Sequence, residues 1–229
     1  MLFRSTDKSN KLKDIQLDCQ PIAMGAGYEN GLALQLATTL SIASIEKTVN
    51  GTPVATADVI EAGHAGETVI KIFNKAQDHI SFNTGARFAN TEEGVTPVTG
   101  HQIRVKLTLS STIDPTLLGE PPYNPFIFRY GQRGLEIHLP NRLPTDLADV
   151  NLFGTEDDDT DYPGLSKTYL SADNKPWALI IPNEWHHPLE NEGINLGYPY
   201  FITWAKTRGF SYADWYQDSK KVSQHLWNN

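Results

Sequence analysis

The chain has 229 residues, of which 39% are hydrophobic and 20% are charged, and it has one cysteine, Cys19. This composition excludes a collagen-like, coiled-coil or wholly disordered chain, an intrachain disulfide and, for lack of an apolar run of roughly 20 residues, a membrane-inserted protein. The formal net charge of −8 argues against a nucleic-acid binder, which typically presents a basic face.

Residues 1–12 are polar and predict a linker, followed by a single domain over residues 13–229. Alternating or short apolar runs then predict a series of strands, because side chains alternate between the two faces of a sheet. These runs are residues 15–19, 32–36, 68–72, 103–109, 126–130, 135–139 and 177–181. The pair Asn50-Gly51 predicts a tight hairpin, and residues 74–100, rich in turn formers, predict a loop.

The end of the chain changes to a helical pattern. Apolar residues from Tyr198 to Ala205 recur at helical spacing, and Gly209 suits the end of that helix. Ser211 and Asp214 resemble a capping box for a second short helix. A lone helix of about 12 residues is marginal in water, so we expect its apolar stripe to pack on the sheet. The fold class is therefore mainly β: an antiparallel β-sandwich, jelly-roll-like, with one or two short C-terminal helices.

The net charge is concentrated in one segment. Seven of the 27 acidic residues lie between Asp146 and Asp161, where there is no lysine or arginine. Without these seven, 20 acidic residues would face 19 basic ones. A surplus that served solubility would be spread over the surface, so we interpret this segment as a local site, with cation binding as the first hypothesis.

Within this segment the D-x-D-x-D spacing is typical of the start of a calcium loop, because alternate side chains can point oxygens at one Ca²⁺ ion. The predicted calcium ligands, or residues that hydrogen-bond to ligands, are Asp157, Asp158, Asp159, Asp161, Thr155, Asp146 and Asp149. Tyr162 and Thr168 stand where an EF-hand has Gly and Glu, so the geometry would differ from an EF-hand. A solvated acidic turn and a transition-metal site are the alternatives.

Three other motifs favour structural roles. His186 and His187 follow Glu184 and could bind zinc, but adjacent side chains of a strand face opposite sides, which favours packing. His138 lies in a predicted strand and is interpreted as a hydrogen-bonded sheet histidine. The glycine-rich segment 25–31 lacks the last glycine of a dinucleotide fingerprint and predicts a tight connection.

Aromatic residues are frequent after residue 176. Aromatic side chains bury large apolar areas, so core packing is the first interpretation. The alternative is that a solvent-facing subset stacks on sugar rings or binds a peptide.

Several motifs occur in a fixed order along residues 14–216. They are GAGYENG (25–31), NPFIF (124–128), EIHLPNRLPTDLAD (136–149), LFGTEDDDTD (152–161), DNKPWALIIP (173–182) and YPYFITWAKTRGFSYADWY (198–216). Together they resemble the LruC-type domain, the DUF4842 family of bacterial exported proteins. The resemblance implies an extracellular or cell-surface location, a position behind upstream domains of the same chain, and a binding or adhesive role more than a reaction.

We therefore expect a non-catalytic module that binds a glycan or peptide ligand, with Ca²⁺ ordering the acidic loop, and no nucleic-acid partner. One alternative is a hydrolase that uses paired carboxylates or His138. The other is a structural module that spaces or anchors neighbouring domains. An exposed aromatic strip beside the acidic loop would favour binding, and a deep pocket with paired carboxylates would favour an enzyme.

Overall fold

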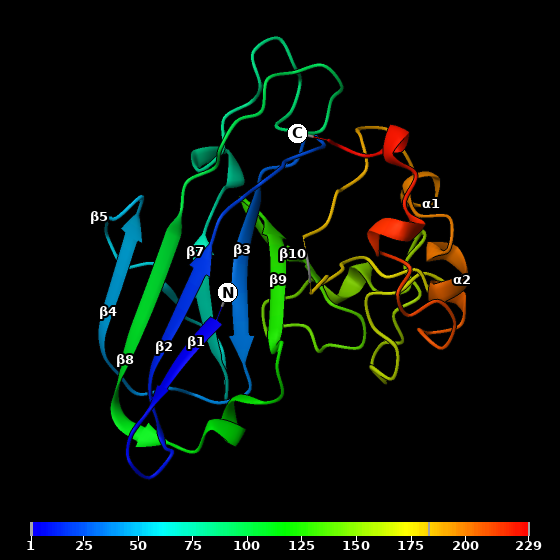
Figure 1. Ribbon diagram of the computed structural model, residues 1–229. Helices are drawn as coiled ribbons and strands as arrows, with labels where there is room; N and C mark the ends of the chain where they lie inside the picture. The colour runs from blue at the N-terminus through cyan, green and yellow to red at the C-terminus, as the bar shows by residue number, and fades with distance from the viewer. Residues whose placement is uncertain (1, 183, 229) are drawn as a thin grey trace.

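The computed structural model describes residues 2–182 and 184–228. Two five-stranded antiparallel sheets pack face to face (Figure 1), in the orders β1-β2-β8-β4-β5 and β10-β9-β3-β7-β6. The strands are β1 Leu2–Thr6, β2 Leu12–Cys19, β3 Asn30–Leu36, β4 Ile42–Val49, β5 Thr52–Pro53, β6 Ile60–Glu61, β7 Thr68–Phe73, β8 Ile103–Ile113, β9 Asn124–Arg129 and β10 Gln132–His138. The prediction of a mainly-β antiparallel sandwich is confirmed.

From β2 to β9, successive long strands alternate between the two sheets, as in jelly-roll-like sandwiches. Strands β2, β4 and β8 belong to the first sheet, while β3, β7 and β9 belong to the second. The α-helices are α1 Ile194–Gly197 and α2 Phe201–Lys206, and the short 3₁₀ helices are η1 Ala76–Asp78, η2 Pro115–Leu118, η3 Val150–Leu152, η4 Asp218–Lys220 and η5 Ser223–His225. In the described part of the chain, no helix has the length and hydrophobicity of a bilayer span.

The main core lies between the sheets. The alternation in β8 turns Ile103, Val105 and Leu107 into this core, where they meet Leu34 and Ile70 of the second sheet. Burial of alternate apolar side chains is what gives each strand its defined inner face. Strand β3 is buried on both faces, because the chain after β10 covers the outer face of the second sheet.

The hairpin between β4 and β5 forms as predicted. Asn50 and Gly51 both have positive φ (50° and 80°), the conformation that a two-residue hairpin requires and that this residue pair readily adopts. Residues 74–100 form a long loop, apart from η1 and one isolated bridge between Met24 and Ala89.

Residues 2–6 pair with the first sheet. Strand β1 lies within the segment predicted as a linker and pairs antiparallel with β2. The hydrophobic alternation in this segment is too short to predict a strand, but the open edge of β2 supplies the hydrogen-bond partners. The assignment of residues 13–229 to a single domain stays a prediction.

The strand predicted at residues 177–181 is wrong. The chain there makes a single bridge, Leu170 with Pro176, and then leaves any ladder. Prolines at positions 176 and 182 remove backbone donors at both ends of the run. Trp177 and Ile180 are 42% and 56% exposed, whereas Leu179 and Ile181 are partly buried against the C-terminal aromatic side chains.

The helical pattern near the C-terminus is confirmed by α2, whereas the second helix predicted at residues 211–216 is wrong. Tyr212 has a positive φ (54°), which interrupts a helix, and Asp214 pairs with Lys220 (2.5 Å) where a capping box would need it to bind the backbone. The segment forms turns in place of a helix.

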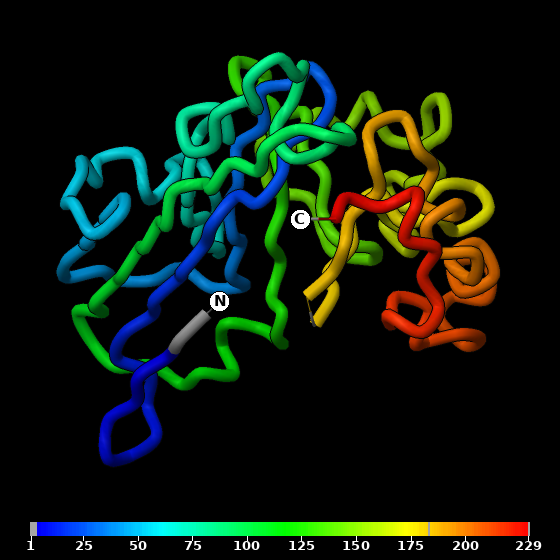
Figure 2. The backbone as a smooth tube through the Cα atoms, turned by 45° about the horizontal axis from the view of Figure 1, so that its top comes forward, coloured from blue at the N-terminus to red at the C-terminus, as the bar shows by residue number. Residues whose placement is uncertain are grey.

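The C-terminal aromatics pack on one another and not on the sheet, which corrects the expected position of the helix. Tyr198, Phe201, Trp215 and Leu226 form a second core, and its partly buried neighbours also come from residues after 178. Figures 1 and 2 show this last part of the chain, orange to red, on the side of β9 and β10 and away from β4 and β8. The aromatic side chains were numerous enough to bury each other without a sheet.

Candidate functional site

The acidic segment follows β10 along the outer face of the second sheet. The Asp149 N–H donates to the carbonyl of Gly134 in β10 (2.8 Å), and Asp149 caps η3 at the N–H of Asn151 (3.2 Å). Asp146 Oδ2 accepts from the N–H of Ala65 (2.7 Å), in the loop between β6 and β7. Two of the predicted calcium ligands therefore attach this segment to β10 and to the loop between β6 and β7.

Asp158 is the centre of the loop that follows η3. Its Oδ2 accepts from the N–H groups of Gly154 (3.0 Å) and Thr160 (3.2 Å). Its Oδ1 accepts from the Thr160 hydroxyl (3.0 Å) and from the indole N–H of Trp177 (2.9 Å). Because four donors already occupy its two oxygens, Asp158 closes the loop around its own side chain and fixes the Trp177 ring.

The other predicted ligands in this loop turn to different partners. Asp159 pairs with the Lys167 ammonium (2.5 Å), Asp161 accepts from the Ser166 hydroxyl (2.5 Å), and the Thr155 hydroxyl donates to a backbone carbonyl (2.6 Å). Among the residues that the structure describes, no three carboxylates of this loop have oxygens within 4.8 Å of one another. The predicted ligands thus share a loop but do not converge, and calcium binding there stays a prediction.

Three surface grooves border the acidic loop. Trp177, Asp157 and Asp158 line two of them, which have volumes of about 550 Å³ and about 910 Å³. Asp159 and Asp161 line the third, of about 680 Å³. Since Trp177 is 42% exposed and is held at its N–H, the rest of its indole is a fixed apolar surface open to the solvent.

The 550 Å³ groove combines apolar walls with a charged rim. Phe128, Leu152 and the 56%-exposed Tyr28 line it together with the carboxylates of Asp149 and Asp157. The Arg129 guanidinium lies 4.6 Å from the centre of the Tyr28 ring and supports that wall. An apolar cleft with a few placed polar groups is the usual form of a small-ligand site.

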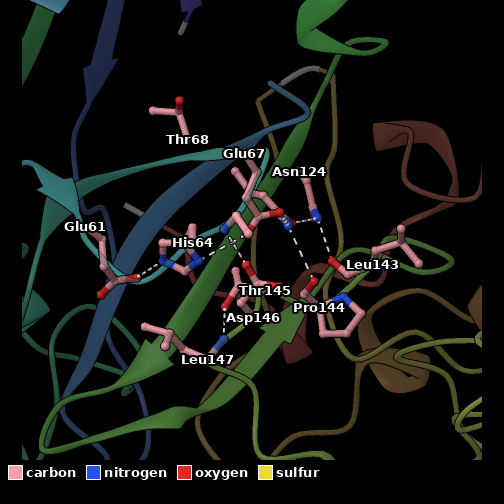
Figure 3. A network of polar contacts seen from close by, with 12 residues as sticks. Glu61, His64, Glu67, Thr68, Asn124, Leu143, Pro144, Thr145, Asp146 and Leu147 are labelled. Carbon is pink, nitrogen blue, oxygen red and sulfur yellow. Dashed lines mark hydrogen bonds and ion pairs between the residues drawn. The ribbon is translucent and has the colours of Figure 1, made fainter. Parts of the chain in front are cut away.

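A closed ring of polar contacts crosses the outer face of the second sheet beneath this segment, and Figure 3 shows part of it. In order around the ring, its members are Glu61, His64, Glu67, Gln35, Asn124, His138, Glu136 and Arg133. The ring joins β6, β3, β9, β10 and the loop before β7. Paired polar groups of this kind can be buried without a large desolvation penalty.

Arg133 is the cation of this ring. Its guanidinium donates to both oxygens of Glu61 (2.6–2.9 Å) and to Glu136 (2.6 Å), and it lies 5.0 Å and 5.1 Å from the rings of Phe126 and Phe128. Burial raises the pKa of Glu61, but its contacts with Arg133 outweigh burial and lower that pKa below its ordinary value. Burial likewise raises the pKa of Glu136, but hydrogen bonds and nearby positive charge lower it overall.

His138 has the role predicted for it, a hydrogen-bonded histidine in a sheet. Its Nδ1 lies 2.8 Å from Oδ1 of Asn124, its Nε2 lies 3.3 Å from Oε1 of Glu136, and its ring stacks on Phe126 at 4.4 Å. Burial lowers the pKa of His138, and the carboxylate of Glu136 offsets this only in part. The residue is 0% exposed, so it presents no surface to a substrate in the hydrolase alternative.

His186 and His187 pack as the sequence favours. His187 Nε2 lies 2.6 Å from the carbonyl of Asn90, and its ring stacks on Trp227. His186 Nδ1 lies 3.2 Å from the carbonyl of Trp227. The two side chains tie the second core to the 74–100 loop and to the end of the chain.

Sequence reasoning missed His64, Glu67 and Arg133. His64 and Glu67 lie near Asp146, and these three form the one group of histidines and acids in the described ranges whose ligand atoms lie within 4.8 Å of one another. The signal available was the sequence EAGHAGE at residues 61–67, in which two glycines flank a histidine between two glutamates.

Comparison with solved structures finds the same fold in another protein. A protein from Bacteroides ovatus, described as a lipoprotein, superposes with a TM-score of 0.64 at 16% sequence identity. The match covers 97% of this chain and 66% of that protein, so the present chain spans less than two thirds of its length. At this identity the likeness shows the fold alone.

Comparison of sequences gives a family without an assigned activity. No curated protein matches the sequence. A family profile described as "Domain of unknown function (DUF4842)" matches residues 10–216, which is most of the chain. The chain therefore belongs to the DUF4842 family.

Proposed function

We propose that this chain is a ligand-binding module of the bacterial cell surface that holds a glycan against Trp177. The observation that carries the proposal is the position of Trp177, half-exposed, fixed by Asp158 and lying between two grooves with carboxylates on their rims. The likeness to a protein described as a lipoprotein supports a surface location.

The chemistry of the grooves favours a sugar. The flat apolar face of an indole or phenol ring fits the C–H face of a pyranose, and both Trp177 and Tyr28 are exposed beside the same groove. Carboxylates accept hydrogen bonds and match sugar hydroxyls, which are donors. Asp149 and Asp157 line that groove, and Arg129 is the one basic residue among its described lining residues.

Preorganisation also supports binding. The Asp158 hydrogen bond restrains the Trp177 ring before any ligand arrives, so binding loses less side-chain entropy than with a freely rotating ring. A rigid aromatic anchor is the kind of residue that dominates binding energy at interfaces.

The test is a glycan and peptide array, run with and without Ca²⁺, on the wild-type chain and two variants. Trp177→Ala and Tyr28→Ala should each weaken glycan binding by about tenfold or more, because each removes one stacking surface. Phe210→Ala is the matched control, since Phe210 is 93% exposed and lines none of the three grooves, and it should bind like the wild type.

Two results would contradict the proposal. One is a chain that binds peptides and no glycan. The other is glycan binding that survives in both Trp177→Ala and Tyr28→Ala.

A further inference from the structure

We propose that His64, Glu67 and Asp146 form a binding site for a divalent transition-metal ion, with zinc as the best match. The site lies where the loop between β6 and β7 meets the start of the acidic segment (Figure 3). It is separate from the Trp177 grooves, and the inference does not depend on the proposed glycan-binding role.

The three side chains offer one ligand atom each within a small volume. These atoms all lie within 4.8 Å of one another, and Nδ1 of His64 is 3.1 Å from Oε1 of Glu67. The His64 side chain is 2% exposed and that of Glu67 is 16% exposed. A centre shared by the three would therefore be largely shielded from water and reached from the Asp146 side, where that residue is exposed.

Two of these atoms meet without a hydrogen bond. Nδ1 of His64 and Oε1 of Glu67 are buried and lie 3.1 Å apart, yet neither makes a hydrogen bond within the described ranges. Buried polar atoms usually make hydrogen bonds, so this contact calls for an explanation. A cation bound between them would satisfy the imidazole nitrogen and the carboxylate oxygen together.

The surroundings of each candidate ligand suit a metal site. His64 Nε2 lies 3.1 Å from Oε2 of Glu61, and Arg133 holds that carboxylate with short hydrogen bonds. In protein metal sites a histidine ligand typically donates its second N–H to a carboxylate, which fixes the tautomer and orients the ring. Here the arrangement leaves Nδ1 as the nitrogen available to a metal.

The two acids are supported in the same way. Glu67 Oε2 accepts from the side-chain amide of Gln35, while Asp146 Oδ2 accepts from the Ala65 N–H at 2.7 Å. Each candidate ligand is therefore held by a neighbouring group of the protein at one of its polar atoms. Supports of this kind orient ligands before a metal arrives.

The backbone of the loop also serves this geometry. Gly63 and Gly66 have φ values of +95° and +78°, a left-handed conformation that other residues rarely adopt. The two glycines let residues 62–67 turn tightly, and Nδ1 of His64 thereby lies 3.1 Å from Oε1 of Glu67 at the end of the same loop. The loop is thereby shaped around the histidine.

The ligand types identify the class of metal. One imidazole with two carboxylates suits zinc and related transition metals, whereas Ca²⁺ and Mg²⁺ prefer oxygen ligands alone. Three protein ligands leave a fourth tetrahedral position for water. The bound ion would join the β6–β7 loop to the acidic segment across 82 residues of sequence, from His64 to Asp146.

The test uses the full chain, treated with a chelator and then titrated with ZnCl₂ in a calorimeter and in thermal melts. We expect one strong zinc site and a rise in Tm of about 5 °C at a hundredfold excess over Kd. Asp146→Asn should weaken zinc binding at least tenfold and remove most of the rise. Its amide oxygen can still accept from Ala65, so the fold should be retained.

Asp157→Asn is the matched control, because it makes the same charge change in the same acidic segment and should bind zinc like the wild type. Glu67→Gln provides a second variant from the other element. Co²⁺ in place of zinc should give visible absorption bands that both Asp146→Asn and Glu67→Gln abolish. No heat and no Tm shift at millimolar Zn²⁺ would overturn the proposal, as would equal zinc binding by the wild type and both ligand variants.

Discussion

Arg133 keeps one buried glutamate, Glu136, and one partly buried glutamate, Glu61, charged. A buried carboxylate without a partner would take up a proton, but here one guanidinium serves both Glu61 and Glu136. Glu136 has a second support in Thr145, whose N–H and hydroxyl donate to it at 2.7 Å and 2.9 Å. This part of the ring is thus an ion-pair cluster in which Arg133 donates to both oxygens of Glu61, and Arg133 and Thr145 together donate to both oxygens of Glu136.

This cluster predicts loss of stability in acid. The pKa of His138 is lowered below its ordinary value of 6.5 in the folded protein. As pH falls below about 6.5, the unfolded chain therefore binds a proton at this histidine more readily than the folded protein does. The free energy of unfolding consequently decreases. The pKa values of Glu61 and Glu136 are also lowered, so their contribution is lost as pH falls below about 4.5. Urea denaturation from pH 7 to pH 4 should show the free energy of unfolding falling throughout.

His138→Gln tests the first part of that curve. Between pH 6.5 and pH 5 the slope should fall by up to about 1.4 kcal/mol per pH unit, the value for one proton. The pKa values of His79 and His187 are also lowered by burial, so these residues should account for the pH dependence of the free energy of unfolding that remains in the variant. An unchanged slope in the variant would show that His138 takes up its proton equally in the folded and unfolded chain.

The sequence could not predict this cluster because its partners are distant along the chain. Glu61 and Arg133 are 72 positions apart, and no motif contains Arg133. His138 was interpreted correctly because its strand has a clear pattern, but its partner Asn124 belongs to β9. The neighbours of a buried charge follow from the pairing of strands, and a single sequence does not fix that pairing.

The acid-rich pattern of the loop is compatible with cation binding and also with hydrogen bonds that hold the loop itself. Alternate acids in D-x-D-x-D could face one cation, yet in this structure Asp158, the residue between the first two, makes the four hydrogen bonds that hold the loop. Asp159 faces Lys167, whose ammonium supplies a positive charge beside the loop. A calcium ion would have to displace that ammonium.

The calcium hypothesis predicts that millimolar Ca²⁺ raises the melting temperature, because an ion that binds only the folded state stabilises it by mass action. Asp159→Ala should remove most of that increase, since it deletes the middle acid of the D-x-D-x-D pattern. Asp173→Ala is the control, because Asp173 also pairs with a lysine (3.1 Å) but lies outside the pattern. Calorimetry without heat at millimolar Ca²⁺, together with an unshifted melt, would contradict it.

The strands of the sandwich were predictable where one face is buried and the other polar, as in β8. Prediction failed at residues 177–181 and 211–216, where apolar and aromatic residues pack in irregular structure. An apolar sequence pattern indicates which side chains are buried. In these two segments the side chains are buried in clusters, and the backbone forms no ladder of β-sheet hydrogen bonds. The exposed surface of Trp177 beside the acidic loop could not be predicted from the sequence, because the contact between Trp177 and Asp158 is visible only in the structure.

The molecule has two main hydrophobic cores that differ in side-chain composition. Aliphatic side chains dominate the sandwich core, whereas the C-terminal core centres on Trp215, which is 1% exposed and contacts the rings of Trp185, Tyr198, Phe201 and Trp204. All of those partners come from the last part of the chain. The stability of the C-terminal core should therefore be separable from that of the sandwich.

Trp215→Ala should destabilise the C-terminal core by about 3–5 kcal/mol, the usual cost of removing a buried tryptophan. Limited proteolysis should then cut the variant first after residue 176, while its β-sheet circular dichroism is retained. Phe210→Ala, at a 93%-exposed position, should leave the cleavage pattern unchanged. A single cooperative melt lowered as a whole would show that the two cores unfold together.

The closed polar ring also governs how the strands of the second sheet can align. Glu136 and His138 lie opposite Phe128 and Phe126 in β9, on the face that meets Arg133 and Asn124. A slip of β10 by one residue would turn both side chains to the other face and leave their partners unpaired. A misaligned sheet would then bury unpaired charges, which costs several kcal/mol. The ring thus disfavours a shifted pairing of β10 with β9, in addition to the alternation of apolar side chains in these strands.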